Sequence, residues 1–335
     1  MVRNMEKIGI IGATGIVGRK TLDVIFEKGL QKNELVLFAS KRHRIKVQGV
    51  VFQVKKLSAK SLFNAGLNYA IFCTKEEISK EYVLSLASLG VKVIDCSSYF
   101  RKDYPLIIPE INSDKITGNV ICNPNCSTSA GVMALYSLHS KFGLDRVVYT
   151  TFQSVSGAGK HALSDLQVKN ALKLKKFKKP IKNNIFSSIG SLDKNGYSTE
   201  ENKMIYETKK ILNDNTIKVT ATCVRVPISN CHSLSINFTL KKKADLKDLE
   251  NILKFTQGVV YLDKEITPLD VVNKSDVYIT RLRKDNSFKN TFNMFVISDN
   301  LRKGASQNAV QVLEKLLALW LFVSLVEHRQ RTKNP

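Results

Sequence analysis

The chain starts with a strand-like run that closes on a glycine-rich turn, and this pattern limits the folds open to it. Residues Lys7–Ile11 have strand character, glycines follow at Gly12, Gly15 and Gly18, and a helical spacing of apolar residues begins at Arg19. Such glycines permit a tight turn and a close approach of the backbone to a diphosphate, whose charge the next helix N-terminus attracts. The pattern predicts a dinucleotide-binding strand, turn and helix; a purely structural turn is the alternative.

Strand-like and helix-length segments alternate through the first part of the chain. Further strands are expected at residues 34–38, 69–72 and 91–95, with a helix at 80–89 between the last two. Alternation of this kind predicts an α/β fold with a parallel, doubly wound sheet of the Rossmann type. We therefore assign residues 1–126 to a dinucleotide-binding domain.

The character of the sequence changes after residue 126. A helical pattern runs to about residue 142, and longer strand-like runs follow at 146–154, 217–226, 234–241 and 291–298. These runs predict a second, α+β domain with an extended sheet over residues 127–300. A final helix is expected from residue 304 to about 326, within a C-terminal segment of residues 301–335.

The residues that follow the second expected strand favour NADP over NAD. NAD enzymes usually place an acidic residue about 20 positions past the glycines, on the ribose hydroxyls. Here residues 39–44 read Ala-Ser-Lys-Arg-His-Arg. A hydroxyl at Ser40 and cations from Lys41 onward suit a 2′-phosphate, so NADP is the predicted cofactor.

Cys126 is the candidate nucleophile among the six cysteines. It stands between Asn125 and Ser127 at the expected N-terminus of a helix, where the dipole and unpaired N–H groups stabilise a thiolate. The other five cysteines are interpreted as small core residues. The six are scattered, without a CxxC pair or a His/Cys cluster at zinc-ligand spacing, so we expect thiols in a reducing compartment and no metal site.

Two further strand ends carry groups that would complete a site around Cys126. Residues 152–160 (Phe-Gln-Ser-Val-Ser-Gly-Ala-Gly-Lys) end one strand in a glycine-rich loop, and Arg225 and His232 lie at the end of another. His232 would supply a base with a pKa near neutrality, and Arg225 a planar fork for a carboxylate. A structural histidine is the alternative for His232 alone. Together the three side chains predict nucleophilic cysteine chemistry.

The formal net charge of +23 at pH 7 raises the alternative of a nucleic-acid-binding protein. The lysines are dispersed, however, and the densest run, residues 173–182, contains one phenylalanine and no recognisable binding module. We interpret it as a solvated loop, and expect the positive charge to attract phosphorylated anions. No apolar stretch reaches the roughly 20 residues of a membrane-spanning helix and no export signal is expected, so a cytoplasmic protein is predicted.

Five motifs stand in the order found in bacterial aspartate-semialdehyde dehydrogenases, and the chain resembles this family over nearly its whole length. They are residues 12–18 (Gly-Ala-Thr-Gly-Ile-Val-Gly), 123–128 (Asn-Pro-Asn-Cys-Ser-Thr), 154–160, 223–227 (Cys-Val-Arg-Val-Pro) with His232, and 299–305 (Asp-Asn-Leu-Arg-Lys-Gly-Ala). Two positions depart from the family pattern. Residues 73–76 read Cys-Thr-Lys-Glu where a small Ser-Ala-Gly-Gly stretch is usual, and Cys231 replaces a glycine.

The resemblance implies a specific reaction. It is the NADPH-dependent reductive dephosphorylation of L-aspartyl 4-phosphate to L-aspartate 4-semialdehyde, on the route to diaminopimelate, lysine, threonine and methionine. The family pattern implies that Cys126 forms a thioester, that His232 is the general acid/base, and that Gln153 orients the acyl group. Cysteine suits this chemistry because its thioester accepts a hydride.

The resemblance also implies which residues bind the ligands. Arg225 would hold the substrate carboxylate and Glu207 its ammonium group, while Arg101 and Lys210 would bind phosphate. Cofactor contacts are implied for Gly12, Thr14, Gly15, Ile16, Val17, Ser40, Lys41, Ser156, Gly157 and Asn300. The C-terminal helix would return to the first domain, and the assembly would be a homodimer or a tetramer.

Two alternatives stay open. The first is N-acetyl-γ-glutamyl-phosphate reductase, which catalyses the same chemistry on a substrate with an acylated amine. Glu207 disfavours this alternative, because an acetylated nitrogen carries no charge for a carboxylate to bind. A basic nucleic-acid-binding protein on a Rossmann scaffold would explain the net charge, but not the register of Cys126, Gln153, Arg225 and His232.

Overall fold

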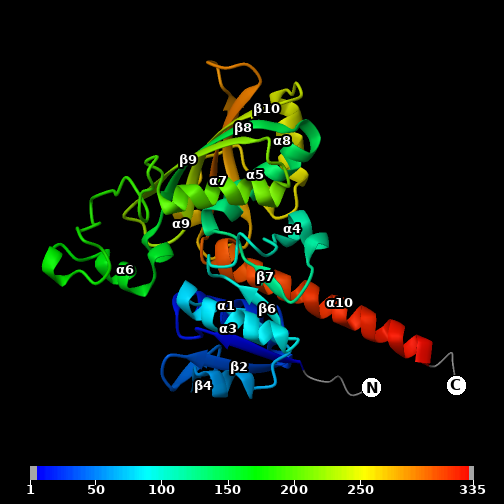
Figure 1. Ribbon diagram of the computed structural model, residues 1–335. Helices are drawn as coiled ribbons and strands as arrows, with labels where there is room; N and C mark the ends of the chain where they lie inside the picture. Colours follow the sequence, from blue (N-terminus) through cyan, green and yellow to red (C-terminus); the bar gives the residue numbers. More distant parts are fainter. Residues whose placement is uncertain (1–5, 332–335) are drawn as a thin grey trace. The chain divides into compact units, whose positions relative to one another are not determined.

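The computed structural model describes residues 6–331, which divide into two compact units (Figure 1). The first unit comprises the described parts of Met1–Ala13, Thr21–Asn123 and Asn308–Pro335, and the second comprises Thr14–Lys20 and Pro124–Gln307. Each unit has its own sheet with helices packed against it. The predicted fold class, a Rossmann-type α/β unit followed by an α+β unit, is confirmed.

The first unit is built on a seven-stranded sheet of order β3-β4-β2-β1-β5-β6-β7. All neighbouring strands are parallel except β3 and β4. The strands are β1 (Lys7–Ile11), β2 (Glu34–Ala39), β3 (His43–Val47), β4 (Val50–Lys56), β5 (Tyr69–Phe72), β6 (Lys92–Asp95) and β7 (Val120–Cys122). The helices are α1 (Ile16–Glu27), α2 (Ala59–Phe63), α3 (Glu76–Ser88), α4 (Pro109–Asn112) and α10 (Gln307–Arg331), with 3₁₀ turns at Leu30–Lys32 and Ser113–Lys115.

The four strands predicted for this unit are present, but the β3–β4 hairpin has no counterpart in the prediction. Most of its side chains are exposed; Ile45 and Val47 alternate with exposed neighbours and are buried, but this alternation is short and lies within a run of cations. Its turn has positive φ at Gln48 (43°) and Gly49 (89°), as two-residue hairpin turns require. His43 and Arg44, which follow the second predicted strand in the sequence, therefore lie in β3.

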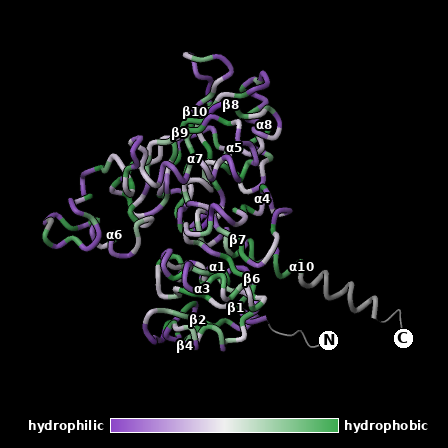
Figure 2. The backbone as a smooth tube through the Cα atoms, viewed as in Figure 1, coloured by the Kyte–Doolittle hydropathy of each residue, from purple (hydrophilic) through white to green (hydrophobic). Residues whose placement is uncertain are grey.

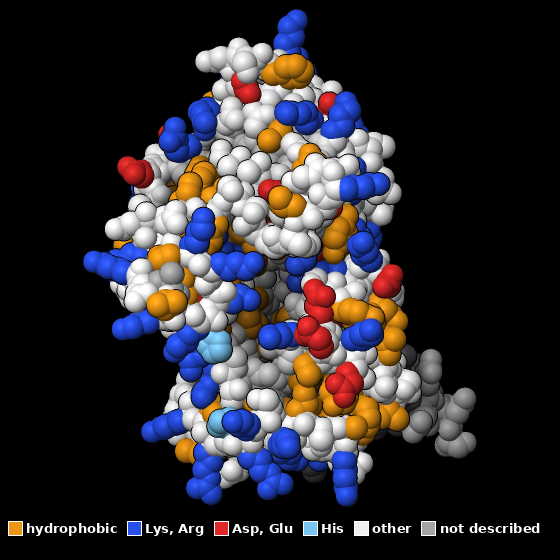
Figure 3. Space-filling view, turned by 60° about the vertical axis from the view of Figure 1, so that its left-hand side comes forward, with side chains coloured by type: hydrophobic (Ala, Val, Ile, Leu, Met, Phe, Trp, Pro, Cys, Tyr) orange, Lys and Arg blue, Asp and Glu red, His pale blue; other side chains and the backbone are white. Residues whose placement is uncertain are grey.

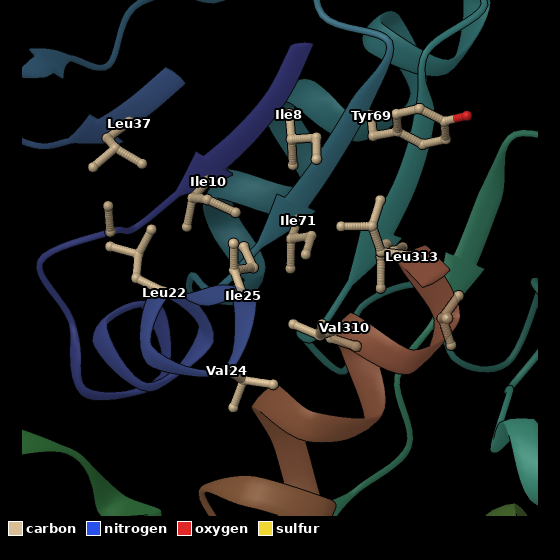
Figure 4. Packing of buried hydrophobic residues seen from close by; sticks show 14 of the residues in the cluster. Ile8, Ile10, Leu22, Val24, Ile25, Leu37, Tyr69, Ile71, Val310 and Leu313 are labelled. Carbon is tan, nitrogen blue, oxygen red and sulfur yellow. The ribbon is translucent and has the colours of Figure 1, made fainter. Parts of the chain in front are cut away.

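The core of the first unit brings together residues far apart in the sequence (Figure 4). Val310 and Leu313 of α10 pack with Ile71 of β5 and Ile25 of α1. At the start of α10, the Asn308 side-chain amide donates to the Ile107 carbonyl and to Asn123 Oδ1, at 2.8 Å each. The helix thereby fixes Asn123, which stands three residues before Cys126 in the sequence.

The second unit is built on a six-stranded mixed sheet of order β11-β12-β13-β10-β8-β9. Its strands are β8 (Leu144–Gln153), β9 (Lys218–Arg225), β10 (His232–Leu240), β11 (Val259–Tyr261), β12 (Val277–Lys284) and β13 (Thr291–Ser298). Its helices are α5 (Cys126–Phe142), α6 (Lys160–Asp165), α7 (Thr199–Leu212), α8 (Leu246–Phe255) and α9 (Pro268–Val271). Short helical turns cover Val155–Ala158, Ala171–Lys173 and Arg302–Ser306.

Helix α5 is buried along most of its length because it lies between the sheet and helices α7 and α8 (Figure 1). Gly131 permits the close approach to β8: a Cβ added there would lie 2.7 Å from Cε1 of Tyr149. The hydroxyl of the same Tyr149 is 3.3 Å from Thr208 Oγ1 of α7. Sheet and helices thus hold the N-terminal end of α5 in one place, which matters because that end carries Cys126.

Charge and hydropathy follow the fold. Hydrophobic colouring runs along β1, β6 and β7, and hydrophilic colouring is frequent in the segment around α6 (Figure 2). The lysine run of residues 173–182 lies in a largely exposed loop, as expected. Lys and Arg side chains are spread over the visible face rather than gathered in one stripe (Figure 3). Among the described residues, no helix has both the length and the apolar composition that a membrane span needs.

Candidate active site

Three predicted site residues lie at one edge of the second sheet. Gln153 ends β8 and Arg225 ends β9, and the parallel register of these strands pairs the two residues directly. His232 begins the antiparallel strand β10, where the neighbouring Ser233 pairs with Phe152 of β8. Because β10 runs opposite to β8, its first residue meets the last residues of β8. All three side chains are almost completely buried.

Cys126 is the first residue of α5, as predicted. The side chain of the preceding Asn125 caps the helix by accepting hydrogen bonds from the backbone N–H groups of Ser127 (2.9 Å) and Thr128 (3.1 Å). Cys126 itself is partly exposed, whereas the remaining polar residues of the first turn are buried. A thiol in this position lies in the positive field of the helix N-terminus, which stabilises a thiolate.

Gly304 packs directly against the candidate nucleophile. A Cβ added to Gly304 would lie 2.7 Å from Cβ of Cys126 and 3.1 Å from its Cα, closer than side chains tolerate. The turn Arg302–Ser306 that carries Gly304 also contacts α5. Glycine in the motif at residues 299–305 is therefore required by the close approach of two backbones beside Cys126.

His232 is held by Ser154, the residue that follows β8. The backbone N–H of Ser154 donates to Nδ1 of His232 at 3.1 Å, and the Ser154 hydroxyl lies at the same distance from Nδ1. A backbone N–H can only donate, so Nδ1 is an acceptor and the proton of the neutral ring is on Nε2. Nε2 is buried and has no hydrogen-bond partner among the described residues. It is therefore available to donate to a bound ligand.

Burial, and after it the positive charge of Arg225, lower the pKa of His232 from 6.5 to about 3. An interaction with the Cys231 backbone raises the pKa and so opposes this shift in part. The pKa near neutrality expected from the sequence is therefore wrong. The strand register that buries His232 beside a guanidinium favours the neutral imidazole, and this neighbour could not be foreseen from the motif alone.

Arg225 is anchored by one of its terminal nitrogens. Its Nη1 donates to the Ser154 carbonyl oxygen at 2.7 Å. Burial lowers the pKa of Arg225, while the charges of Glu200 and Cys126 act in the opposite direction. Because the charge of Cys126 affects the pKa of Arg225, the guanidinium lies within electrostatic range of the candidate nucleophile.

Helix α7 brings two carboxylates to the start of α5. Oε2 of Glu207 accepts a hydrogen bond from the backbone N–H of Asn125 at 2.7 Å, and Oε1 of Glu200 accepts from the Asn125 side-chain amide at 2.7 Å. Glu207, predicted to bind the substrate ammonium, is completely buried. Lys210 lies one helical turn further on, in the last turn of α7. The predicted substrate residues Glu207 and Lys210 thus share one helix next to Cys126.

Asn300 supports the loop between β8 and α6. Its Oδ1 accepts from the Ser156 hydroxyl (3.2 Å), the Ser154 hydroxyl (3.1 Å) and the backbone N–H of Cys231 (3.0 Å). Gly157 follows Ser156, and a Cβ added there would lie 3.1 Å from Nε2 of His232. Ser156, Gly157 and Asn300 are predicted cofactor contacts, and they are neighbours of His232.

Cys231 adopts a left-handed backbone conformation, with φ of 69°. Glycine favours this region, which accounts for the glycine usual in the family pattern. The Cys231 side chain is buried in a cluster with Ile266, Val271 and Ile297. Burial raises the pKa of Cys231 to about 12, and also that of Cys223. These two thiols stay protonated, in keeping with their interpretation as core residues.

The predicted cofactor residues of the first unit lie at the carboxyl ends of its parallel strands. Gly12 follows β1 with φ of 86°, and an added Cβ would collide with the Cys73 carbonyl oxygen and with Thr74. The Thr74 hydroxyl is buried and has no partner within residues 6–331. Ser40 and Lys41 follow β2 and are exposed. This edge of a doubly wound sheet is where dinucleotides bind.

The remaining predicted residues are placed as follows. Thr14 and Gly15 lie in the turn between β1 and α1, Ile16 and Val17 begin α1, and the first turn of α1 contains no acidic residue that would repel a diphosphate. Arg101 lies in the first unit, where its Nη2 donates to the Cys96 carbonyl oxygen at 3.1 Å. The described residues contain no group of three or more His, Cys, Asp or Glu side chains arranged to hold a metal ion.

Comparisons with known proteins identify the family. Residues 7–119 match the family profile "Semialdehyde dehydrogenase, NAD binding domain", and residues 135–303 match "Semialdehyde dehydrogenase, dimerisation domain". The aspartate-semialdehyde dehydrogenase of Aquifex aeolicus is 39% identical over 93% of this chain and 98% of its own length. The chain belongs to the aspartate-semialdehyde dehydrogenase family. The Bacillus subtilis aspartate-semialdehyde dehydrogenase is 36% identical, covering 93% and 97% of the two chains.

A solved structure supports the same assignment. Aspartate semialdehyde dehydrogenase II of Vibrio cholerae, complexed with ASA, has a TM-score of 0.89 and 33% identity, covering 94% of this chain and 99% of that one. The residues matched by the semialdehyde dehydrogenase dimerisation profile include Gln153, Arg225 and His232. Cys126 lies between the two matched ranges.

Two residues at the centre of the site have no counterpart in the sequence-based prediction. Ser154 holds both His232 and Arg225, and Glu200 binds the side chains of Asn125 and Gln153. Ser154 is the first residue of the motif at residues 154–160, and this position in a motif is the feature of the sequence that could have indicated a role in the site. Glu200 stands in the first turn of a helix, where acidic residues are common for reasons of local electrostatics, and its sequence context gives no indication of its contacts.

Proposed function

We propose that the chain catalyses the NADPH-dependent reductive dephosphorylation of L-aspartyl 4-phosphate to L-aspartate 4-semialdehyde through a thioester on Cys126. The observation that carries this proposal is the position of Cys126 at a capped helix N-terminus, within the electrostatic reach of a buried arginine at the edge that also holds Gln153 and His232. Membership of the aspartate-semialdehyde dehydrogenase family supports the substrate.

In this mechanism the Cys126 thiolate attacks the acyl carbon, the new C–S bond forms, and the bond to phosphate breaks. A bound reduced cofactor would supply a hydride for the thioester carbonyl, and the Cys126 thiolate would leave as the aldehyde forms. Arg225 would hold the substrate carboxylate and Glu207 its ammonium group, while Arg101 and Lys210 would bind phosphate. Each cation would thus meet an anionic part of the substrate.

His232 would act from Nε2. Because its pKa is lowered to about 3, the ring is neutral at physiological pH and Nε2 carries a proton. That N–H would donate to the acyl oxygen as negative charge develops on it, both during thiolate attack and during reduction. The general acid/base role implied by the family would in the opposite direction require Nε2 to accept the proton of a hemithioacetal, and therefore a ring whose Nε2 is unprotonated.

The first unit fits a dinucleotide. Gly12 leaves room that a side chain would fill, the buried Thr74 hydroxyl beside it can still form a hydrogen bond, and the start of α1 has no acidic residue. Gly12, Thr14, Gly15, Ile16 and Val17 would contact the diphosphate region. Ser40 and Lys41 would bind the 2′-phosphate, and Ser156, Gly157 and Asn300 would contribute further cofactor contacts.

NADPH is expected to bind more tightly than NADH, because a hydroxyl and a cation replace the acidic ribose ligand at Ser40 and Lys41. Changing Lys41 to Glu should narrow or reverse this preference, while Lys60→Glu, at an exposed position in α2 of the same unit, should leave it unchanged. Fluorescence titration of both cofactors measures the ratio of dissociation constants. Equal affinities of the unaltered protein for NADPH and NADH would refute the cofactor assignment.

Arg225→Lys is expected to lower kcat/KM for aspartate semialdehyde by roughly tenfold or more, because an ammonium cannot reproduce a two-point grip on a carboxylate. Steady-state kinetics with aspartate semialdehyde, phosphate and NADP measures this loss. Arg101→Ala should instead chiefly raise the KM for phosphate. An Arg225→Lys enzyme with unchanged kcat/KM would show that Arg225 is structural.

An assay of phosphate-dependent NADP reduction tests the proposed function against its closest alternative. Aspartate semialdehyde should be turned over, and N-acetylglutamate semialdehyde should not, because Glu207 would bind a charged amine. Turnover of only the acetylated substrate would identify the reductase of the acylated amine instead. Binding to duplex DNA that weakens steeply with salt, without either activity, would favour the nucleic-acid alternative.

The assembly and location are part of the same proposal. The family profile over residues 135–303 is a dimerisation domain, which supports a homodimer or a tetramer built from dimers. A cytoplasmic location suits six thiols in a reducing compartment. We also propose that residues 1–126 bind the cofactor, that residues 127–300 carry catalysis and dimerisation, and that residues 301–335 return to the first domain.

A further inference from the structure

Glu200 is a buried carboxylate next to the candidate nucleophile, and the mechanism above does not use it. It is the second residue of α7 and only 8% exposed. The carboxylate of the neighbouring Glu201 is accounted for by structural contacts, because it closes the capping box with Ser198 and accepts the backbone N–H of Cys223. Glu200 is turned instead toward the start of α5. Burying a carboxylate is costly unless it is hydrogen-bonded, so its contacts require an explanation.

One oxygen of Glu200 binds two amides from different elements of the site. Oε1 accepts from the Asn125 side chain at 2.7 Å and from Gln153 Nε2 at 3.2 Å. The second oxygen, Oε2, lies 3.7 Å from the Lys203 ammonium. Glu200 thus connects the helix cap before Cys126 to the end of β8, and Lys203 partly balances its charge.

These contacts fix the orientation of both amide groups, because an ionised carboxylate can only accept hydrogen bonds. With Nδ2 of Asn125 directed to Glu200, Oδ1 of Asn125 must face the N–H groups of Ser127 and Thr128, which is the geometry that caps α5. Gln153 Nε2 is engaged by Glu200 and by Thr151 Oγ1 (3.3 Å), so its remaining polar atom is the carbonyl oxygen. Without Glu200, the Gln153 amide could rotate by half a turn, because the Thr151 hydroxyl can donate as well as accept, and the Asn125 side chain would lose the partner of its Nδ2.

We propose that Glu200 is a positioning residue, whose Oε1 fixes the amides of Asn125 and Gln153 and so holds the Cys126 helix start and the Gln153 carbonyl oxygen in their reactive arrangement. The inference rests on the proposed function for its meaning in catalysis. Its structural content, the control of the Cys126 environment, does not depend on the identity of the substrate. The two amides require a hydrogen-bond acceptor at the end of a side chain as long as that of glutamate. They do not require its negative charge.

Four variants distinguish the effect of the length of the Glu200 side chain from the effect of its charge. Glu200→Gln keeps the length and an acceptor oxygen but removes the charge. Glu200→Asp keeps the charge but shortens the side chain, and Glu200→Ala removes both. Lys203→Met is the matched control, since it removes the ion pair at Oε2 and leaves the hydrogen bonds at Oε1 in place.

We expect kcat with aspartate semialdehyde to fall roughly 10- to 100-fold in Glu200→Ala and Glu200→Asp, because small misplacements at a reacting centre have effects of this size. Glu200→Gln and Lys203→Met should stay within a few-fold of the unaltered enzyme. NADP binding and the thermal midpoint, measured in parallel, report whether a variant is folded. If Glu200→Ala does not fold, the comparison of Glu200→Gln with Glu200→Asp still decides the question.

The pH profile of Cys126 alkylation by iodoacetamide provides a second readout that needs no substrate. Glu200→Ala and Glu200→Asp should change this profile, and Glu200→Gln should restore an alkylation rate close to that of the unaltered protein. An Asp variant that is fully active beside an inactive Gln variant, or an Ala variant with normal kcat and a normal alkylation profile, would overturn the proposal. Absence of activity in the unaltered protein would contradict the proposed function only, since alkylation still tests Glu200.

Discussion

Cys126→Ser is expected to lower turnover by more than roughly three orders of magnitude, through loss of nucleophilic catalysis. A hydroxyl is much less acidic than a thiol, so the helix N-terminus that stabilises a thiolate cannot produce an equivalent alkoxide. The serine ester would also be a poorer hydride acceptor than a thioester. Because the substitution replaces one atom at a partly exposed position, folding and NADP binding should be unchanged. Steady-state kinetics, cofactor titration and thermal unfolding measure the three properties.

Cys231→Ser is the matched control for this experiment. Cys231 lies next to His232, but its side chain packs in an apolar cluster and burial raises its pKa to about 12. The serine variant should therefore retain substantial activity, with a cost that appears in the thermal midpoint instead. Near-normal turnover by Cys126→Ser, or a loss in Cys231→Ser as large as that expected for Cys126, would be incompatible with the proposed mechanism.

His232→Ala is expected to reduce kcat by roughly 10²- to 10³-fold, the typical effect of removing one donor to a developing oxyanion. Because the pKa of His232 is lowered to about 3, no ionisation of this residue should appear in the kcat/KM profile between pH 5 and 9. His161→Ala, at an exposed position in the same unit, is the control and should have normal kinetics. A His232→Ala enzyme with normal kcat would remove His232 from the mechanism.

The same depressed pKa predicts how stability depends on pH. Between pH 6.5 and about 3 the unfolded chain protonates this histidine and the folded chain does not, so the unfolded state binds more protons. The free energy of unfolding should therefore fall as the pH is lowered below 6.5, by up to about 1.4 kcal/mol per pH unit from this residue. His232→Ala should flatten that part of the profile in denaturant titrations. An identical slope in both proteins would show that His232 is not buried in its neutral form.

The motifs predicted which segments meet, but not how their side chains are held. Cys126, Gln153, Arg225 and His232 could be proposed because each follows or begins a recognisable strand or helix, and parallel and antiparallel registers bring such ends to one edge. Whether they share an edge depends on strand order, which periodicity does not encode. The β3–β4 hairpin was missed for a different reason: its apolar alternation is short and is surrounded by exposed, charged side chains.

The electrostatic properties of the site were the least accessible from the sequence. The pKa of His232 depends on its burial and on Arg225, seven residues away along the chain and adjacent only after the sheet forms. In the sequence, Glu200 looks like an ordinary acidic residue in the first turn of a helix. Its contacts with Asn125 and Gln153 exist only because α7 packs beside α5 in the fold. The left-handed backbone of Cys231 explains why glycine is usual there, but this explanation needs the φ angle of 69°. Helix starts and strand ends can be recognised from local sequence, whereas the side chains that one element contributes to the environment of another cannot.

Mass spectrometry of protein quenched during turnover tests the central claim most directly. The protein is mixed with the acyl phosphate in the absence of reduced cofactor, quenched in acid and digested, and the peptides that carry each of the six cysteines are compared. A covalent aspartyl adduct on the peptide containing Cys126, absent from Cys126→Ser, is the predicted result. An adduct on the peptide containing Cys231, or an adduct that persists in Cys126→Ser, would contradict the assignment of Cys126 as the nucleophile.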